Sequence, residues 1–263
     1  MTPMGSMDAI CDDLAAEQEA LDVVVAALPA EEWELATPAP GWAVRDQIGH
    51  LQYFDATATL AATDAEAFVA SVAALGPIDN TLTASRAMTP AELLAEWRAG
   101  RVRMLDTFRG LDAKTRLPWY GPPMSAMSFA TARLMETWAH GQDVVDALHA
   151  TRPATDRLRH VAHIGVRARP FSYRANKLEP PESDVFVALR APSGETWSWG
   201  DAALPDRVVG DALDFCLVVT QRRHVADTAL TVEGPLATEW IAIAQAFAGP
   251  PGHGRRPGQF PRS

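Results

Sequence analysis

The segment TPAELLAEWRAGRVRMLDTFRG, residues 89–110, decides the fold because it contains both ends of one long helix. Thr89 is a suitable N-cap, Pro90 fits the first helical turn, and Glu92 completes a capping box. The helix is expected to end near Gly110. The apolar residues between these ends recur at helical spacing: Leu93, Leu94, Trp97, Val102, Leu105 and Phe108.

Three further helices are predicted around this segment, because apolar residues recur there with the same period. Their predicted ranges are 10–28, 43–62 and 125–150. Pro29 stops the first of them, Ser125 can cap the last, and residues 79–89 read as a loop. Four helices of this length, joined by modest loops, predict a four-helix bundle over residues 1–150.

Beyond Pro153 the pattern changes to a mixture of helices and strands. The elements expected there are helices over 154–169, 208–225 and 236–247, a hairpin of strands 184–190 and 195–199, and a strand over 229–232. The fold class is therefore a four-helix bundle followed by a smaller α+β domain over residues 151–263. Its tail, from about residue 249, is rich in glycine and proline and is expected to be flexible.

Charge and cysteine content exclude several classes of protein. The chain has 23 basic and 33 acidic side chains, a net charge of −10 that repels a phosphate backbone, so no nucleic-acid partner is expected. Cys11 and Cys216 are far apart and form no disulfide framework, which fits a reducing compartment. A secretory signal has basic residues before its apolar stretch, and no basic residue precedes Arg45, so no such signal is expected. The apolar runs are also too short to span a bilayer. A cytoplasmic protein without a membrane partner is expected.

The chain lacks the usual signatures of nucleophilic and nucleotide-dependent enzymes. It has no G-x-S-x-G motif, no Walker loop, no dinucleotide-binding glycine motif and no H-E-x-x-H. Glu136 and His140 are four residues apart and lie on one face of a predicted helix. Because apolar residues share this face, burial of the pair is costly unless it is hydrogen-bonded or binds a metal. A surface pair with this spacing is the alternative.

His50 lies on the second predicted helix between Ile48 and Leu51, which also places it on an inward side. One histidine from this helix and the Glu136–His140 pair from another can meet inside a bundle. Two imidazoles and one carboxylate offer three metal ligands and leave an open coordination position. The residues alone fit equally well a hydrogen-bonded core histidine near a buried ion pair. Asp143, one turn beyond His140, is a candidate to orient that imidazole or an ordinary surface carboxylate.

The segment PAPGWAVRDQIGHL, residues 38–51, is similar to a motif of the DinB/YfiT-like bundle proteins. It most resembles the mycothiol-dependent maleylpyruvate isomerase family, whose helix P-G-W-(S/T)-V-x-D-x-x-x-H-L provides one metal ligand. A later E-x3-H or H-x3-H helix of that family provides the other two. The resemblance covers about residues 8–150. It implies that His50, Glu136 and His140 bind a divalent metal, usually zinc.

The second half resembles uncharacterised actinobacterial metal-binding relatives and departs from the isomerase itself, so activity on maleylpyruvate does not carry over. Part of it is also similar to a wyosine-base-formation segment, without the cysteines that radical chemistry requires. In the resembled isomerases an arginine of the C-terminal domain holds the substrate carboxylate. Arg222 and Arg223 are the nearest matches, although cations there also complement a helix dipole.

A further basic stretch lies between Asp156 and Glu179, with five arginines, Lys177 and two histidines but no acid. It fits either an anion site near the domain junction or a solvated helix face that balances the acidic first helix.

The family resemblance implies a chemistry based on an open metal position. In the family this position binds water or the thiol of a small cofactor such as mycothiol, and a bound thiol becomes a thiolate. The expected function is a zinc-dependent isomerase or transferase whose partners are a low-molecular-weight thiol and a small electrophilic substrate. The alternatives are a metal-dependent hydrolase and a non-catalytic ligand-binding or regulatory protein with a structural metal.

Overall fold

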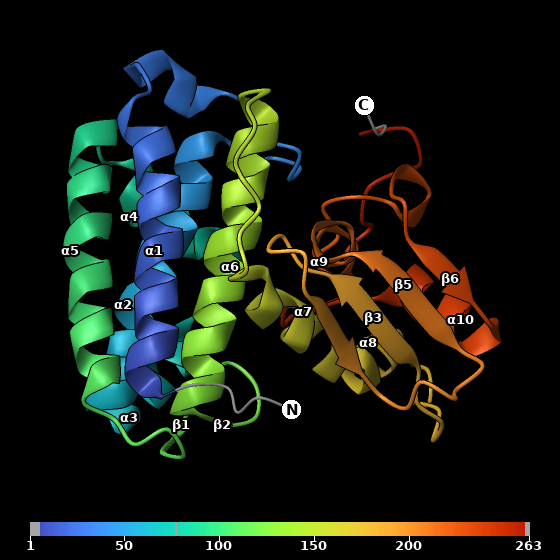
Figure 1. Ribbon diagram of the computed structural model, residues 1–263. Coiled ribbons are helices and arrows are strands. Elements are labelled where there is room, and N and C mark those ends of the chain that lie inside the picture. The colour runs from blue at the N-terminus through green and yellow to red at the C-terminus, as the bar shows by residue number, and fades with distance from the viewer. Residues whose placement is uncertain (1–5, 77, 261–263) are drawn as a thin grey trace. The chain divides into compact units, whose positions relative to one another are not determined.

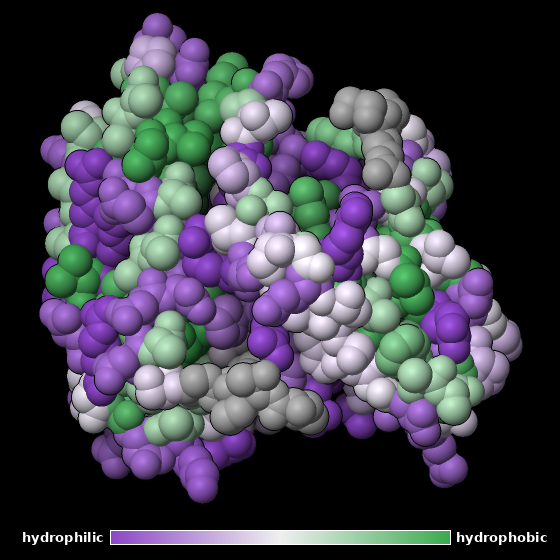
Figure 2. Space-filling model, viewed as in Figure 1, coloured by the Kyte–Doolittle hydropathy of each residue, from purple (hydrophilic) through white to green (hydrophobic). Residues whose placement is uncertain are grey.

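The structure is a computed structural model that describes residues 6–76 and 78–260. The chain divides into two compact units, Met1–Arg152 and Pro153–Ser263. The first unit is helical and the second combines helices with a small sheet, which confirms the predicted fold class. Among the residues described, no helix is both long enough and apolar enough to cross a membrane. Hydrophilic side chains cover much of the visible face of the helical unit (Figure 2).

The main elements of the first unit are four long helices, which run side by side (Figure 1). They are α1 (Met7–Ala26), α2 (Val44–Thr63), α5 (Pro90–Arg109) and α6 (Ala126–Ala147). Helix α2 packs against α5 and α6, and α1 packs against the same two helices. This arrangement brings one face of α2 against one face of α6 inside the bundle.

The predicted capping box of α5 is present. The backbone N–H of Thr89 donates to Glu92 Oε2 over 2.8 Å, and the N–H of Glu92 donates back to Thr89 Oγ1 over 3.3 Å. The apolar residues at this spacing are buried except Val102, which is 55% exposed and does not belong to the buried stripe. Val102 follows the buried Leu93 by nine residues, and at about 100° per residue it therefore lies on the opposite side of the helix.

The connections of the bundle contain more helix than the sequence predicts. Helix α3 (Ala65–Ala74) was not expected, and the stretch predicted as a loop holds the 3-10 helix η2 (Ile78–Leu82) and the short helix α4 (Thr83–Arg86). Another 3-10 helix, η1 (Ala30–Glu34), precedes α2. Strands β1 (Arg116–Leu117) and β2 (Met124–Ser125) pair antiparallel before α6.

The second unit begins with α7 (Leu158–Arg167) and α8 (Arg169–Ala175), where one helix was predicted. Its sheet has the strand order β4-β3-β5-β6. The strands are β3 (Phe186–Arg190), β4 (Thr196–Trp199), β5 (Arg207–Asp211) and β6 (Thr231–Glu233). The predicted hairpin is β3–β4, whereas β3 and β5 pair in parallel.

The helix predicted over residues 208–225 was wrong at both ends. Its first part is strand β5, because Val208 and Val209 pair with Val187 and Ala188 of β3. Helix α9 (Ala212–Val219) follows, and the 3-10 helix η3 (Val225–Asp227) comes after it. Helix α10 (Pro235–Ile243) ends four residues before the predicted end.

The described part of the tail has no helix or strand, as predicted. It nevertheless contacts the rest of the second unit. The side-chain amide of Gln245 donates to the carbonyl oxygens of Phe247 and Gly249, and the N–H of Gly258 donates to Asp227 over 2.8 Å.

Candidate metal centre

The three side chains proposed as metal ligands lie together in the bundle. His50 projects from α2, whereas Glu136 and His140 lie one turn apart on α6. Their ligand atoms all lie within 4.8 Å of one another. The helical spacing on α6 and the packing of α6 against α2 together produce this cluster.

One carboxylate oxygen of Glu136 faces both imidazoles. Glu136 Oε2 lies 3.2 Å from His140 Nε2 and 3.7 Å from His50 Nε2. The two imidazole centroids are 4.2 Å apart. The three side chains are 11–21% exposed, so the cluster is mostly buried but can be reached from solvent.

This donor set fits a zinc ion. With bonds of about 2.1 Å, two ligand atoms of a tetrahedral zinc lie about 3.4 Å apart, close to the two separations measured from Glu136 Oε2. Two imidazoles and a carboxylate also form a common catalytic zinc ligand set. Three protein ligands leave one position of a tetrahedral ion for a water or another small ligand.

The protonation states suit a metal ligand set. Burial lowers the pKa of His50 to about 3, and repulsion from His140 acts in the same direction, so the His50 imidazole is neutral at pH 7. Burial raises the pKa of Glu136, but the hydrogen bonds to His140 and His50 outweigh it and hold this pKa well below its usual range. The cluster therefore presents a neutral imidazole beside a carboxylate anion.

The second ring nitrogen of His140, Nδ1, contacts a residue that was not predicted as part of the site. The buried Gln47 of α2 places its Oε1 atom 2.6 Å from His140 Nδ1. Both nitrogens of His140 are thus engaged, one with Gln47 and one with Glu136, and Asp143 is not the residue that orients this ring. Trp42 stacks on the same imidazole at a centroid distance of 5.9 Å.

His50 has different surroundings. Its Nδ1 atom is buried and has no hydrogen-bond partner among the described residues. Phe54, one turn further along α2, lies 4.4 Å from the His50 ring. Beyond it, Trp119 and Tyr120 from the β1–β2 connection contact Phe54, so an aromatic wall extends from the imidazole.

A buried ion pair links α2 and α6 near the cluster. Arg133, one turn before Glu136, donates from Nε and Nη2 to Asp55 Oδ1 over 3.0 and 2.9 Å. Asp55 Oδ2 accepts further hydrogen bonds from Trp97 of α5 and Gln18 of α1. One carboxylate therefore binds polar groups from the other three long helices. In the sequence, the signal for this pair is that Asp55 and Arg133 interrupt otherwise apolar helix faces.

Both cysteine thiols of the chain are poor nucleophiles. Burial raises the pKa of Cys11 to about 11 and that of Cys216 well above its usual range. Thiol chemistry at this site would therefore require a thiol that the protein itself does not supply.

Arg222 and Arg223 follow α9 in the second unit. Arg222 Nη1 donates to the carbonyl oxygen of Thr220, and Arg223 Nη1 donates to that of Arg222, both over 2.7 Å. These contacts agree with cations that satisfy carbonyl groups at a helix end. A substrate-binding role for either arginine stays a prediction.

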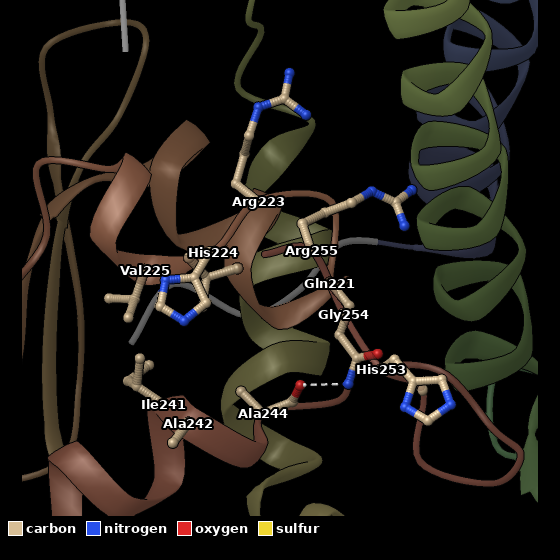
Figure 3. Close-up of a pocket in the computed structure, with 12 residues that line it drawn as sticks. Gln221, Arg223, His224, Val225, Ile241, Ala242, Ala244, His253, Gly254 and Arg255 are labelled. Atoms are coloured by element: carbon tan, nitrogen blue, oxygen red, sulfur yellow. Dashed lines mark hydrogen bonds between the residues drawn. The ribbon is translucent and has the colours of Figure 1, made fainter. Parts of the chain in front are cut away.

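Arg223 also lines a small pocket of about 100 Å³ in the second unit (Figure 3). Basic side chains of His224, His253 and Arg255 share its lining with apolar residues. The guanidinium groups of Arg223 and Arg255 point away from Ile241 and Ala242 at the other side of the pocket. Their directions do not converge on one ligand position.

In the basic stretch of the second unit, Arg169 is buried and already engaged. Its Nη2 atom donates to Asp184 and to the carbonyl oxygen of Ser183 over 3.0 and 2.7 Å. At Arg169 the basic stretch therefore stabilises the fold.

Comparison with known proteins supplies a family. The sequence profile described as "Mycothiol maleylpyruvate isomerase N-terminal domain" matches residues 14–145. Uncharacterised proteins from two strains of Mycobacterium tuberculosis are each 50% identical over 248 residues, which covers 92% of this chain and 96% of theirs.

Two solved structures share the fold. The crystal structure of a mycothiol-dependent maleylpyruvate isomerase aligns with a TM-score of 0.60 at 13% identity, over 88% of this chain and 95% of that one. A histidine-to-alanine mutant of that isomerase aligns with a TM-score of 0.59 at 14% identity and the same coverage. The likeness in fold therefore extends into the second unit.

Proposed function

Because the chain belongs to the mycothiol maleylpyruvate isomerase N-terminal domain family, we propose that it is a zinc-dependent enzyme that uses a low-molecular-weight thiol. It acts on a small electrophilic substrate as an isomerase or a thiol transferase. The observation that carries this proposal is the convergence of His50, Glu136 and His140 on one point between α2 and α6.

These three residues would hold the ion, and the bound ion would supply a Lewis-acidic position that lowers the pKa of a coordinated thiol or water. Glu136 contributes a negative charge that offsets part of the charge of a divalent cation. His50 remains neutral at pH 7 and needs no deprotonation before it binds the metal. Phe54, Trp119 and Tyr120 would give the site an apolar side next to His50.

The thiol must come from outside the chain, because Cys11 and Cys216 are buried and protonated at neutral pH. Mycothiol is the thiol that we propose, since the solved structures of this fold are described as mycothiol-dependent. A carboxylate on the substrate would bind to Arg222 or Arg223. The substrate itself need not be maleylpyruvate, because identity to the solved isomerase is 13%.

Elemental analysis of the purified protein tests the metal. We expect about one divalent ion per chain after reconstitution with zinc, and His140→Ala should lose most of it because two ligands hold zinc weakly. Asp143→Ala is a matched control on the same helix, since Asp143 is not bonded to either ring nitrogen of His140. A wild-type protein that binds no zinc would refute the proposed site.

Cobalt substitution tests the thiol. A thiol that binds the open position should add a sulfur-to-metal charge-transfer band to the cobalt spectrum when mycothiol is titrated in. The same titration with Glu136→Gln should give no band. If the spectrum of the cobalt protein does not change when mycothiol or simpler thiols are added, thiol dependence is overturned. Hydrolysis or non-catalytic ligand binding is then favoured.

A further inference from the structure

A chain of polar groups connects His140 to the loop that precedes α2. The hydroxyl of Thr37 donates to the carbonyl oxygen of Trp42 over 3.0 Å. The side-chain amide of Gln47 lies 2.8 Å from Thr37 Oγ1 through Nε2 and 2.6 Å from His140 Nδ1 through Oε1. Gln47 is fully buried, so water cannot replace either partner.

The direction of each hydrogen bond in this series of polar groups follows from the bond between Thr37 and Trp42. A hydroxyl has one proton, and that of Thr37 is committed to Trp42, so Thr37 Oγ1 accepts from Gln47. Gln47 must then turn its NH2 group toward Thr37 and its carbonyl oxygen toward His140. A carbonyl oxygen only accepts, and His140 Nδ1 must therefore carry a proton.

We infer that Gln47 is a positioning residue that fixes the proton of His140 on Nδ1 and so directs the lone pair of Nε2 at the metal. The inference rests on the proposed metal site and assigns a role to a residue that does not touch the ion. It also distinguishes the two imidazoles, since His50 Nδ1 has no such acceptor among the described residues.

The geometry at Nε2 agrees with this assignment. His140 Nε2 lies 3.2 Å from Glu136 Oε2. With its first proton held on Nδ1, His140 can share this contact in two ways: a second proton on Nε2 donates to Glu136, or a metal ion takes the place of that proton between the two atoms. Gln47 thus leaves Nε2 as the nitrogen that faces the metal together with Glu136.

Nuclear magnetic resonance of histidine labelled with nitrogen-15 tests the proton directly. We expect a proton bound to His140 Nδ1 in both the metal-free and the zinc-loaded protein, assigned by the loss of its signal in His140→Ala. It should exchange slowly because Gln47 buries it. An His140 ring without a proton on Nδ1 would overturn the inference, even if the protein bound zinc normally.

Variants at Gln47 test the consequence for the metal. Gln47→Leu removes the acceptor and should weaken zinc binding by roughly 10- to 100-fold in competition with a chelator. Gln47→Glu keeps an acceptor oxygen and should restore affinity to within about threefold of wild type. Gln18→Leu removes another fully buried amide that contacts Asp55 and no proposed ligand, and should leave zinc affinity unchanged.

The outcomes separate this inference from the proposed function. Equal zinc affinities of the wild type, Gln47→Leu and Gln47→Glu would refute the positioning role while leaving the metal site intact. A wild type that binds no zinc but shows the slowly exchanging Nδ1 proton, lost in Gln47→Leu, would refute the metal site and retain the role of Gln47 in fixing the ring. Circular dichroism and melting temperatures of each variant verify that it folds.

Discussion

Asp55 and Arg133 form a fully buried ion pair between the two helices that carry the candidate metal ligands. The Arg133 side chain is 1% exposed and that of Asp55 is 0% exposed. Arg133 lies one turn from Glu136, and Asp55 lies five residues beyond His50 on α2. The pair therefore fixes the register of α2 against α6 close to the point where the three ligands meet.

Breaking this pair should strongly destabilise the protein. Arg133→Met leaves a buried carboxylate without its charged partner, and such changes typically cost about 3–5 kcal/mol of unfolding free energy. The double variant Asp55→Leu/Arg133→Met removes both charges and should be less destabilised than the sum of the two single variants. Urea unfolding of all four proteins measures the coupling. Strictly additive single effects would show that the two charges do not stabilise each other.

A second ion pair should produce a pH-dependent contribution to stability. Asp22 of α1 accepts two hydrogen bonds from Arg98 of α5, over 2.8 and 2.6 Å. The hydrogen bond to Arg98 lowers the pKa of Asp22, and burial opposes it more weakly. A lowered folded pKa stabilises the protein above the unfolded value near 3.8, and this stabilisation is lost as the pH falls through the folded pKa.

Asp22→Asn should therefore lower the unfolding free energy by about 1–2 kcal/mol at pH 7. The difference from wild type should shrink below pH 3.8, where unfolded Asp22 becomes protonated. Urea titrations at pH 7, 5 and 3 measure this trend. Asp12→Asn is a suitable control, because Asp12 is bound to Arg109 at the exposed surface. A difference for Asp22→Asn that grew toward low pH would contradict the assigned direction.

Local sequence signals predicted the long helices well. The start of α5 follows from Thr89, Pro90 and Glu92, all of which lie within its first turn. The start of α6 follows in the same way from Ser125, whose hydroxyl accepts from the N–H of Ser128. Strand β5 was missed because its pairing with β3 lies about 20 residues away in sequence, and local periodicity carries no information on such a partner.

The candidate site was predicted only in part, again because local sequence signals do not show contacts between distant segments. His50, Glu136 and His140 could be found because helical spacing and the family motif mark them. Gln47 could not, because its contact with His140 spans 93 residues and depends on how α2 and α6 pack. Asp143 was a candidate on spacing alone, but its position one turn past His140 does not bring it to a free ring nitrogen.

The exposure of Val102 leads to a simple test of the α5 core. Val102→Thr should change the unfolding free energy by no more than about 0.5 kcal/mol, because the side chain is 55% exposed. Leu93→Ala on the buried face should cost about 2–5 kcal/mol, since Leu93 is fully buried. Thermal and urea unfolding of both variants measure the contrast. Similar losses in the two variants would place Val102 in the core after all.

Removal of the metal should lower the stability of the protein without unfolding the bundle. The bundle buries apolar stripes from all four long helices, so its core does not depend on an ion. Free zinc at a concentration a thousandfold above its dissociation constant would add about 4 kcal/mol to the unfolding free energy. Chelation should therefore lower the melting temperature by several degrees and leave the helical circular dichroism at 25 °C intact.

His50→Ala provides the matched variant for this experiment. It should melt near the temperature of the chelated wild type and should no longer respond to added zinc, because it removes the ligand that α2 contributes. Thr59→Ala, at a partly exposed position on the same helix, should retain the response to zinc. Complete unfolding on chelation would identify a structural metal and remove the main support for an enzyme. If chelation left the melting temperature unchanged while His50→Ala still destabilised the protein, His50 would be an ordinary core histidine, packed against Phe54 at 4.4 Å.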